Sequence, residues 1–376
     1  MEPTSRLFEP LTLGGVTLSN RIAVSPMCQY SAEEGSANDW HLQHLGALSL
    51  SGAGLVIVEQ TAVEPEGRIS HGCLGLYSDA NERALARVVA LCRRWGSARL
   101  GIQLAHAGRK ASAKLPWQGG GPLAPDAGAW TTLAPSAVPV DESWPLPQAL
   151  DEEGLARIRD AHVEAAKRAD RLGFDLVELL GAHGFLLHSF LSPIANRRSD
   201  RYGGSLANRM RFPLAVAAAL RAVWPRDKPL GMRITGSDWI AGGITPEEAG
   251  LFARELREIG FDYVCVSSGG IGPQARVAFA PGYQVPFAAA VRKASGIAVQ
   301  AVGMIVEPRQ AEAVVADGHA DCVALARAFL DDPRWAWHAA DALGAEIAYP
   351  RQYRRARPDQ WPGAPLSANR RATAPG

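Results

Sequence analysis

The 376-residue chain has almost no net charge and few cysteines. Its 39 basic and 38 acidic side chains leave a formal net charge of +1, so there is no overall field that would attract nucleic acid or an anionic membrane. The five cysteines are scattered, odd in number and contain no C-x-x-C pair, which argues against a disulfide framework and against a zinc site. These absences predict a small-molecule partner, no bound metal and a reducing compartment.

Long hydrophobic runs are also missing, as are two common motifs, one that binds dinucleotides and one that carries a catalytic serine. No stretch approaches the ~20 apolar residues that a membrane span requires, and residues 1–9 lack a basic stretch followed by an apolar run. We therefore expect no membrane association and a cytoplasmic location. No G-x-G-x-x-G follows a strand and no G-x-S-x-G is present, which argues against a Rossmann domain and against a serine-hydrolase elbow.

The chain does contain short apolar runs, rich in Val, Ile and Leu, that alternate with helix-like stretches. This alternation is typical of parallel strands buried on both faces. We predict eight strands, at residues 22–25, 55–59, 100–104, 176–180, 230–234, 263–267, 298–303 and 322–325. Eight such units close a barrel, so the predicted fold class is α/β, a (β/α)8 TIM barrel.

Local signals mark the ends of several predicted helices. Thr245, followed by Pro246 and two glutamates, is a capping box that opens a helix to about residue 259. Residues 151–171 and 81–94 are amphipathic and are also predicted helices. Glycines at 173, 260 and 318 precede predicted strands, as expected for a left-handed residue after a helix.

One connection is too long for a simple strand-to-helix loop. Residues 110–150, after the third strand, are rich in Pro, Gly and Trp, and we expect this extended loop to cover the mouth of the barrel because long insertions are usually functional. We predict a single barrel domain over residues 1–357. Residues 358–376 have little to bury and are predicted to be a disordered tail.

In such barrels the functional groups follow the carboxyl ends of the strands. Gly303 and Arg327 follow the last two strands, where phosphates are often bound; an equal alternative is that Arg327 pairs with a carboxylate and Gly303 only makes a turn. His183 follows the fourth strand and is a candidate hydrogen-bond donor to a carbonyl oxygen, although a lone histidine is more often structural. Cys28 follows the first strand, and a nucleophilic role is the weaker interpretation because no partner pattern is visible.

Longer motifs carry a specific resemblance. They are SPMCQY at 25–30, GIQLAHAGRKAS at 101–112, FLSP at 190–193, YGGS at 202–205, PGYQV at 281–285 and AVGMI at 301–305. Together they strongly resemble the Old Yellow Enzyme family of flavin oxidoreductases, and Cys28 within the first motif resembles the thermophilic-like subclass. The likeness covers nearly the whole chain apart from the final tail.

The resemblance implies non-covalent FMN, reduced by NADPH or NADH and reoxidised by an α,β-unsaturated carbonyl compound in a ping-pong cycle. By position, it implies that the flavin ring is lined by Ser25, Pro26, Met27 and Cys28, that its polar edge meets Gln60, Gln103 and Arg233, and that its phosphate is held by Gly303, Ala326 and Arg327. Cys28 is implied to tune the redox potential and Tyr30 to face the substrate. Arg355 matches an arginine that enters a neighbouring subunit's site, which implies a homodimer or homotetramer.

The fourth strand departs from the family pattern. Family members commonly have Glu-Leu-His-x-x-His/Asn-Gly-Tyr, whereas this chain has ELLGAHGF at 178–185. Leu180 cannot donate a hydrogen bond and Phe185 cannot supply a proton, so the substrate pocket formed with His183 and Tyr30 is atypical. We expect His183 to be the remaining carbonyl donor and Tyr30 the auxiliary acid.

This departure leaves several functions open. Enone reduction is expected to be impaired, whereas quinones and nitro compounds, whose reduced oxygens take protons from solvent, escape much of the penalty. A redox-neutral flavin-dependent isomerase or desaturase of an enone-like substrate is the main alternative. A non-catalytic flavin-binding protein is a third possibility, disfavoured because Cys28, Tyr30, His183 and Arg233 are retained.

Overall fold

The computed structural model describes residues 5–366 of the chain. Residues 367–376, which belong to the tail predicted as disordered, lie outside the described residues. The preceding part of that tail includes the short 3-10 helix η7 (Ala364–Leu366), in which Ala364 is buried. The prediction of a disordered tail and of a domain boundary at residue 357 stays a prediction.

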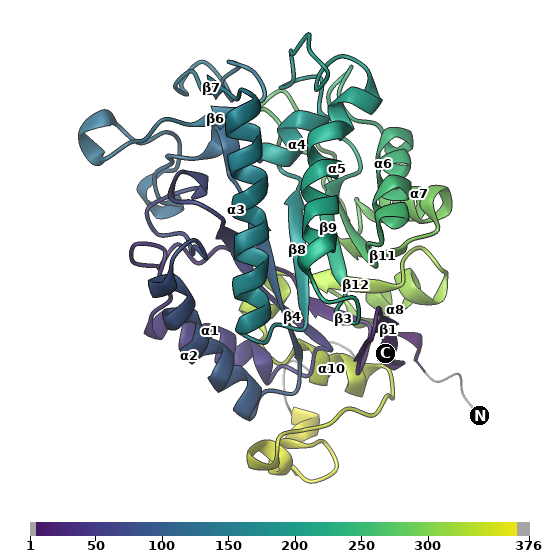
Figure 1. Ribbon diagram of the computed structural model, residues 1–376. Helices are drawn as coiled ribbons and strands as arrows, with labels where there is room; N and C mark the ends of the chain where they lie inside the picture. The colour runs from purple at the N-terminus through teal and green to yellow at the C-terminus, as the bar shows by residue number, and fades with distance from the viewer. Residues whose placement is uncertain (1–4, 367–376) are drawn as a thin grey trace.

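Eight parallel strands form a closed barrel, as predicted (Figure 1). In the order in which they pair they are β3 (Ile22–Val24), β4 (Leu55–Ala62), β5 (Arg99–Ala105), β8 (Leu176–Gly181), β9 (Leu230–Thr235), β10 (Tyr263–Ser267), β11 (Ala298–Val302) and β12 (Cys322–Leu325). The last strand pairs with the first, with Val323 opposite Ile22, so the barrel has no free edge. Each predicted strand overlaps one of these.

Helices surround the barrel, and Figure 1 shows α3, α5, α6 and α7 standing outside the strands. They are α1 (Asp39–Ser49), α2 (Asp79–Trp95), α3 (Glu152–Arg171), α4 (Leu186–Leu191), α5 (Leu206–Val223), α6 (Pro246–Ile259), α7 (Val285–Ser295), α8 (Pro308–Ala316), α9 (Arg327–Asp331) and α10 (Trp335–Ala342). The predicted start and end of α6 are confirmed, because the Thr245 side chain accepts from the Glu248 N–H and Gly260 is left-handed. The other two predicted helices are α3 and α2, the latter beginning two residues earlier than expected.

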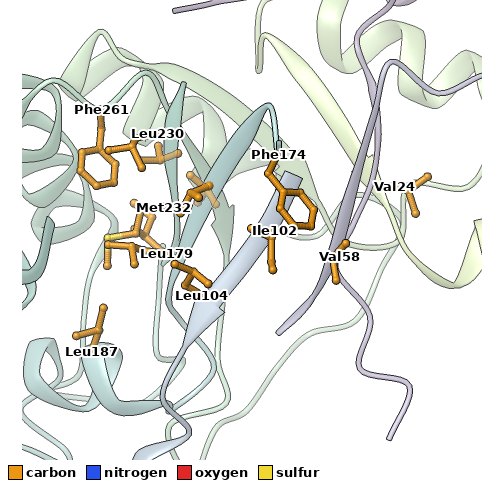
Figure 2. Packing of buried hydrophobic residues seen from close by; sticks show 14 of the residues in the cluster. Val24, Val58, Ile102, Leu104, Phe174, Leu179, Leu187, Leu230, Met232 and Phe261 are labelled. Carbon is orange, nitrogen blue, oxygen red and sulfur yellow. The ribbon is translucent and has the colours of Figure 1, made fainter. Parts of the chain in front are cut away.

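Side chains alternate between the two faces of the barrel wall. Val56 and Val58 of β4 belong to the large core between strands and helices, whereas Leu55 and Ile57 belong to the core inside the barrel. Figure 2 shows part of the outer core, where Leu104, Leu179 and Met232 from three neighbouring strands lie near Leu187 of α4. Burial on both faces explains why these strands are almost uninterrupted apolar runs in the sequence.

A short hairpin closes the amino-terminal end of the barrel. Its strands, β1 (Leu11–Leu13) and β2 (Val16–Leu18), pair antiparallel. Leu13 and Leu18 pack into the same cluster as the inward-facing side chains of the barrel. We did not predict this hairpin, because three-residue strands give too little periodicity to be recognised.

The extended connection after the third barrel strand, β5, contains some regular structure. Its two short strands, β6 (Leu133–Ala134) and β7 (Gln148–Ala149), pair in parallel. At one point the connection reaches the loop after the first barrel strand, where the ring of Trp117 lies 6.2 Å from that of Tyr30. The connection therefore does extend over residues at the mouth of the barrel.

The described residues can be searched for two features that the sequence is expected to lack, a membrane-spanning helix and a metal site. Within residues 5–366, no helix is both long enough and apolar enough to cross a membrane. In the same range, no group of three or more His, Cys, Asp or Glu side chains is arranged to hold a metal ion.

Gly231 offers a test of packing inside the barrel. A Cβ at this position would lie 2.0 Å from the ring of Tyr263, which is 1% exposed and cannot move aside. We expect Gly231→Ala to lower the free energy of unfolding by about 1–3 kcal/mol, as measured by urea denaturation followed by circular dichroism. Gly46→Ala in helix α1, where a Cβ would meet only the end of the Leu91 side chain, is the matched control and should change stability by less than about 1 kcal/mol.

Candidate active site

A cavity of about 750 Å³ opens at the carboxyl ends of the later barrel strands. This volume is within the range of cofactor sites. The walls include Arg233 of β9, Ser267 of β10, Val302 of β11 and Leu325 of β12, together with His183, Gly303, Ala326 and Arg327. Five residues predicted from the sequence, His183, Arg233, Gly303, Ala326 and Arg327, therefore line one cavity.

Below this cavity the barrel interior is polar. Glu178 of β8 is fully buried and accepts hydrogen bonds from Gln103 Nε2 (2.7 Å) and from the Tyr263 hydroxyl (2.8 Å). Burial raises the pKa of Glu178, and the nearby Arg233 guanidinium opposes that rise. Arg233 Nη1 donates to Ser25 Oγ (3.0 Å) after the first strand. The layer thus brings together side chains from five strands or the residues that follow them, and it places a cation at the top of the barrel.

Two buried donors in this region have no partner. Among the described residues, neither Gln60 Nε2 nor Arg233 Nε makes a hydrogen bond, although both atoms are buried. An unsatisfied buried donor is costly, and a ligand with acceptor atoms would satisfy both. The polar edge of a flavin ring carries such acceptors, so these residues fit FMN.

The far side of the cavity fits a phosphate. Gly303 has φ +111°, and a Cβ there would lie 2.3 Å from Gln284 Nε2, so only glycine suits this position. Arg327 is exposed and begins α9 directly after Ala326, and within residues 5–366 no ion pair joins it to a carboxylate. Of the two alternatives drawn from the sequence, this geometry favours a ligand for Arg327 over an ion pair.

The segment after the first barrel strand, residues 25–30, is fixed by a hydrogen bond to a buried carboxylate. Ser25 is buried, and Pro26, Met27, Cys28 and Tyr30 are half-buried. The backbone N–H next to Cys28, that of Gln29, donates to the buried carboxylate of Glu59 (3.0 Å). This bond fixes the direction in which the neighbouring side chains project.

Cys28 and Tyr30 are both poor proton donors in this environment. The Cys28 thiol lies 3.9 Å from Gln60 Oε1, and burial raises its pKa well above the ordinary value. A neutral thiol is a weak nucleophile. This agrees with the sequence, from which a nucleophilic role for Cys28 is the weaker interpretation. Burial likewise raises the pKa of Tyr30, and the nearby Cys28 and Cys73 sulfurs add to this rise.

His183 has an unusual backbone conformation, with φ 60°. Its Nε2 lies 2.8 Å from Ser267 Oγ. Burial lowers the pKa of His183 well below the ordinary value, and the positive charges of Arg233 and Lys110 lower it further, so the ring is neutral. A neutral imidazole carries one proton. The Ser267 hydroxyl donates to Gln284 Oε1 (3.3 Å), so it accepts from His183 and the imidazole proton is on Nε2. Nε2 is therefore the nitrogen that can donate to a ligand oxygen, in place of Ser267.

Further contacts hold the loop that carries His183. The Gly184 N–H donates to His188 Nδ1 (2.7 Å), and His188 Nε2 lies 2.9 Å from Asp238 Oδ1. The side chains of His188 and Asp238 are fully buried. The strained conformation of His183 is therefore supported by a buried network, as expected at a functional position.

The two residues that differ from the family pattern, Leu180 and Phe185, form an apolar patch. Leu180 is 2% exposed and packs with Ala105, Ala182 and Phe185. The ring of Phe185 lies 6.5 Å from that of His183, edge to face. No hydrogen-bonding group replaces the histidine and tyrosine of the family pattern at these two positions.

Lys110 is a residue whose role the sequence did not reveal. It belongs to a quoted motif, but nothing in the motif indicates its contacts. Its Nζ donates to the carbonyl oxygens of His183 (2.8 Å) and Gly270 (3.0 Å) and lies 5.6 Å from the Phe185 ring centroid. It therefore joins the loops that follow β8 and β10.

Other polar residues at strand ends have structural partners. His106 lies 2.9 Å from Glu64, and Arg109 donates to the carbonyl oxygens of Val138, Pro139 and Ile271. Arg355 is exposed on the 3-10 helix η6 (Arg351–Ala356). In Figure 1 the yellow C-terminal segment lies below α10, away from α4 and the cavity end of the barrel.

Comparison with known proteins places these features in context. The NADH:flavin oxidoreductase / NADH oxidase family matches residues 6–346. The chain is 43% identical over 351 residues to an NADPH dehydrogenase of Geobacillus thermodenitrificans (strain NG80-2), covering 93% of this chain and 98% of that protein. An NADPH dehydrogenase of Listeria monocytogenes serotype 4a (strain HCC23) is 42% identical over 354 residues, covering 94% and 99%.

Solved structures give a consistent result. Morphinone reductase in complex with tetrahydroNAD superposes with a TM-score of 0.75 at 28% identity, covering 93% of each chain. A 2-naphthoyl-CoA reductase complex superposes with a TM-score of 0.81 at 23% identity, and this likeness shows the fold alone. The superposition covers 91% of this chain and 52% of that reductase.

The contact between Ser267 and His183 can be tested by NMR. We expect His183 to be neutral with its proton on Nε2, so its 15N shifts should be constant between pH 6 and 8. Ser267→Ala removes the hydroxyl next to Nε2 (2.8 Å), and the tautomer protonated on Nδ1 should then become detectable. Ser267→Thr keeps a hydroxyl and should resemble the parent, and His183→Gln assigns the resonances. Protonation of Nδ1 in the parent protein would contradict the assignment.

Proposed function

We propose that this chain, which belongs to the NADH:flavin oxidoreductase / NADH oxidase family and is an NAD(P)H-dependent flavin oxidoreductase of the Old Yellow Enzyme type, reduces electrophilic small molecules. The substrate classes are activated C=C bonds of α,β-unsaturated carbonyls, quinones and nitro compounds, in a ping-pong cycle. The observation that carries the proposal is the cavity at the barrel mouth, where the cation of Arg233 and the single imidazole of His183 face the same space.

FMN is the cofactor, and when bound it supplies hydride transfer between NADPH or NADH and the second substrate. We assign its ring to Ser25, Pro26, Met27, Cys28, Gln60, Gln103 and Arg233, and its phosphate to Gly303, Ala326 and Arg327. The unpartnered donors of Gln60 and Arg233 support this assignment. Because a buried cation favours a nearby negative charge, Arg233 stabilises the reduced state of the cofactor.

On the substrate side, His183 binds the carbonyl oxygen through Nε2 and Tyr30 faces the substrate, next to Leu180 and Phe185. Loss of one of two donors to a developing oxyanion costs about 2–4 kcal/mol, or ~10²–10³ in rate. Quinones and nitro compounds avoid part of this penalty because solvent protonates their reduced oxygens. We therefore propose that they are reduced faster than simple enones.

A redox-neutral isomerase or desaturase is the second candidate. The observation that favours it is the apolar pair Leu180 and Phe185. Without the usual acid, a reaction intermediate is protonated more slowly and can react in another way. Turnover of an enone-like substrate under anaerobic conditions, with no NADPH or NADH, would select this candidate.

We also propose that the enzyme is a cytoplasmic homodimer or homotetramer in which Arg355 reaches a neighbouring subunit's active site. The exposure of Arg355 on η6 supports this arrangement. Sedimentation analysis gives the oligomeric state, and mixing Arg355→Ala subunits with a second inactive variant tests whether sites are shared.

Anaerobic half-reactions provide the main test. We expect purified protein to carry FMN, which NADPH or NADH bleaches and which enones, quinones or nitro compounds then reoxidise on rapid mixing. Protein that holds no FMN and shows no bleaching with either reductant would contradict the proposal. The relative reoxidation rates identify the preferred substrate class.

Leu180→His tests the cost of the missing donor. If the pocket is otherwise intact, the new imidazole should raise the rate of enone-dependent reoxidation by ~10²-fold, since it restores a second donor. Reoxidation by a quinone should change much less. Leu180→Met, which keeps the site apolar, is the control. No gain with Leu180→His would mean that the site is built for a different substrate.

A further inference from the structure

Lys110 is attached to the part of the active site that lacks an acid. It lies at the end of the 3-10 helix η3 (Gly108–Lys110), after the third barrel strand. Its Nζ is held between two loops by the carbonyl oxygens of His183 (2.8 Å) and Gly270 (3.0 Å). Two backbone contacts fix the position of a side chain that is otherwise long and flexible.

The ammonium group of Lys110 also lies over the ring of Phe185. An ammonium group has three donors, and the two carbonyls use two of them. No third acceptor for Nζ is found within the described part of the chain. The Phe185 ring centroid is 5.6 Å from Nζ, and this ring occupies the position at which the family pattern has tyrosine.

The surroundings of Lys110 make it a stronger acid than an ordinary lysine. Burial lowers the pKa of Lys110 to about 8, and the neighbouring Arg109 guanidinium contributes. Its other ionisable neighbour is His183, which is neutral, and within residues 5–366 no carboxylate forms an ion pair with it. Lys110 therefore remains protonated near neutral pH but releases its proton readily, as a general acid should.

Alternative acids near this position are less suitable. Burial raises the pKa of Tyr30, so its phenol is a weaker acid than usual. The neutral imidazole of His183 has a single proton, on the Nε2 that faces Ser267 (2.8 Å), and that proton is needed to bind the substrate carbonyl. Phe185 has no ionisable group.

We propose that Lys110 protonates the α carbon of an α,β-unsaturated carbonyl substrate, in place of the tyrosine that this chain lacks at position 185. The inference rests on the proposed function. When FMN is bound, its reduced form would supply the hydride taken up at the β carbon. Lys110 Nζ gives its proton to the α carbon, where the π electrons of the C=C bond form the new C–H bond. Water then returns a proton to the neutral amine, so electrons and protons balance.

The test compares two oxidants in the reoxidation half-reaction of the FMN-loaded enzyme. Lys110→Met should slow reoxidation by an enone by ~10²-fold, the usual contribution of a general acid. Reoxidation by benzoquinone, whose oxygens take protons from solvent, should stay within about twofold. Lys114→Met, the same change at an exposed lysine four residues away, should resemble the parent with both oxidants.

Two further variants separate proton donation from positioning. Lys110→Arg keeps the positive charge and the donors but holds its proton too tightly, and it should be as slow with the enone as Lys110→Met. Adding Phe185→Tyr to Lys110→Met should restore most of the enone rate. In the parent, the enone-dependent rate should fall as the pH rises through about 8, the pKa of Lys110, because the proton is lost.

Product stereochemistry gives a readout that does not depend on rate. With an α-substituted enone, a fixed donor delivers the proton to one face, so the parent should give one α-epimer in excess. Lys110→Met should give a mixture closer to equal. Flavin content and melting temperature, measured for every variant, identify any that fail to fold.

Three results would overturn the proposal. They are equal slowing of enone and quinone by Lys110→Met, a normal enone rate in Lys110→Arg, and no rescue by Phe185→Tyr; each would mean that Lys110 only holds the loops of His183 and Gly270. Failure of the parent to reoxidise with any oxidant would instead contradict the proposed function, so the two failures are distinguishable.

Discussion

The buried carboxylate of Glu178 is the interaction on which the site depends. A carboxylate inside a barrel is costly unless it is paired and hydrogen-bonded. Here it accepts from Gln103 and Tyr263 and lies near the positive charge of Arg233. The same carboxylate therefore orients an amide and compensates a cation. This gives the barrel two distinct halves, one apolar and closed by a hairpin, the other polar and open to a ligand.

The loops above this layer are fixed by mutual contact. A Cβ at Gly184 would lie 2.3 Å from the carbonyl oxygen of Gly270, and a Cβ at Gly270 would lie 2.8 Å from the Cα of His183. Backbones can come this close only because both residues are glycine. Lys110 spans the same junction through its two carbonyl contacts, so the position of His183 depends on three segments that are distant in sequence.

The sequence predicted the eight strands of the barrel because burial on both faces leaves long apolar runs. It also located the main helices through signals such as Thr245 and Gly260, whose roles are local. The hairpin of β1 and β2 was missed because each strand has only three residues. The placement of five predicted residues around one cavity follows from the regularity of the fold, in which every strand ends at the same rim.

The parts of the site that depend on three-dimensional contacts could not be predicted. Nothing in the residues around Lys110 indicates that its nitrogen meets the carbonyls of His183 and Gly270. The pairing of His183 with Ser267 joins residues 84 positions apart, and neither neighbourhood carries a signal for it. Glu59 ends the second predicted strand, and nothing in the sequence indicates that its carboxylate accepts from the Gln29 N–H.

The hairpin of β1 and β2 also determines from which end of the barrel the two reactants reach the cofactor. Since Leu13 and Leu18 fill the closed end, reductant and oxidant must both approach from the rim, and each obstructs the other while it is there. A single opening thus admits every ligand of the barrel, a restraint that arises from the closed amino-terminal end and not from the residues at the rim.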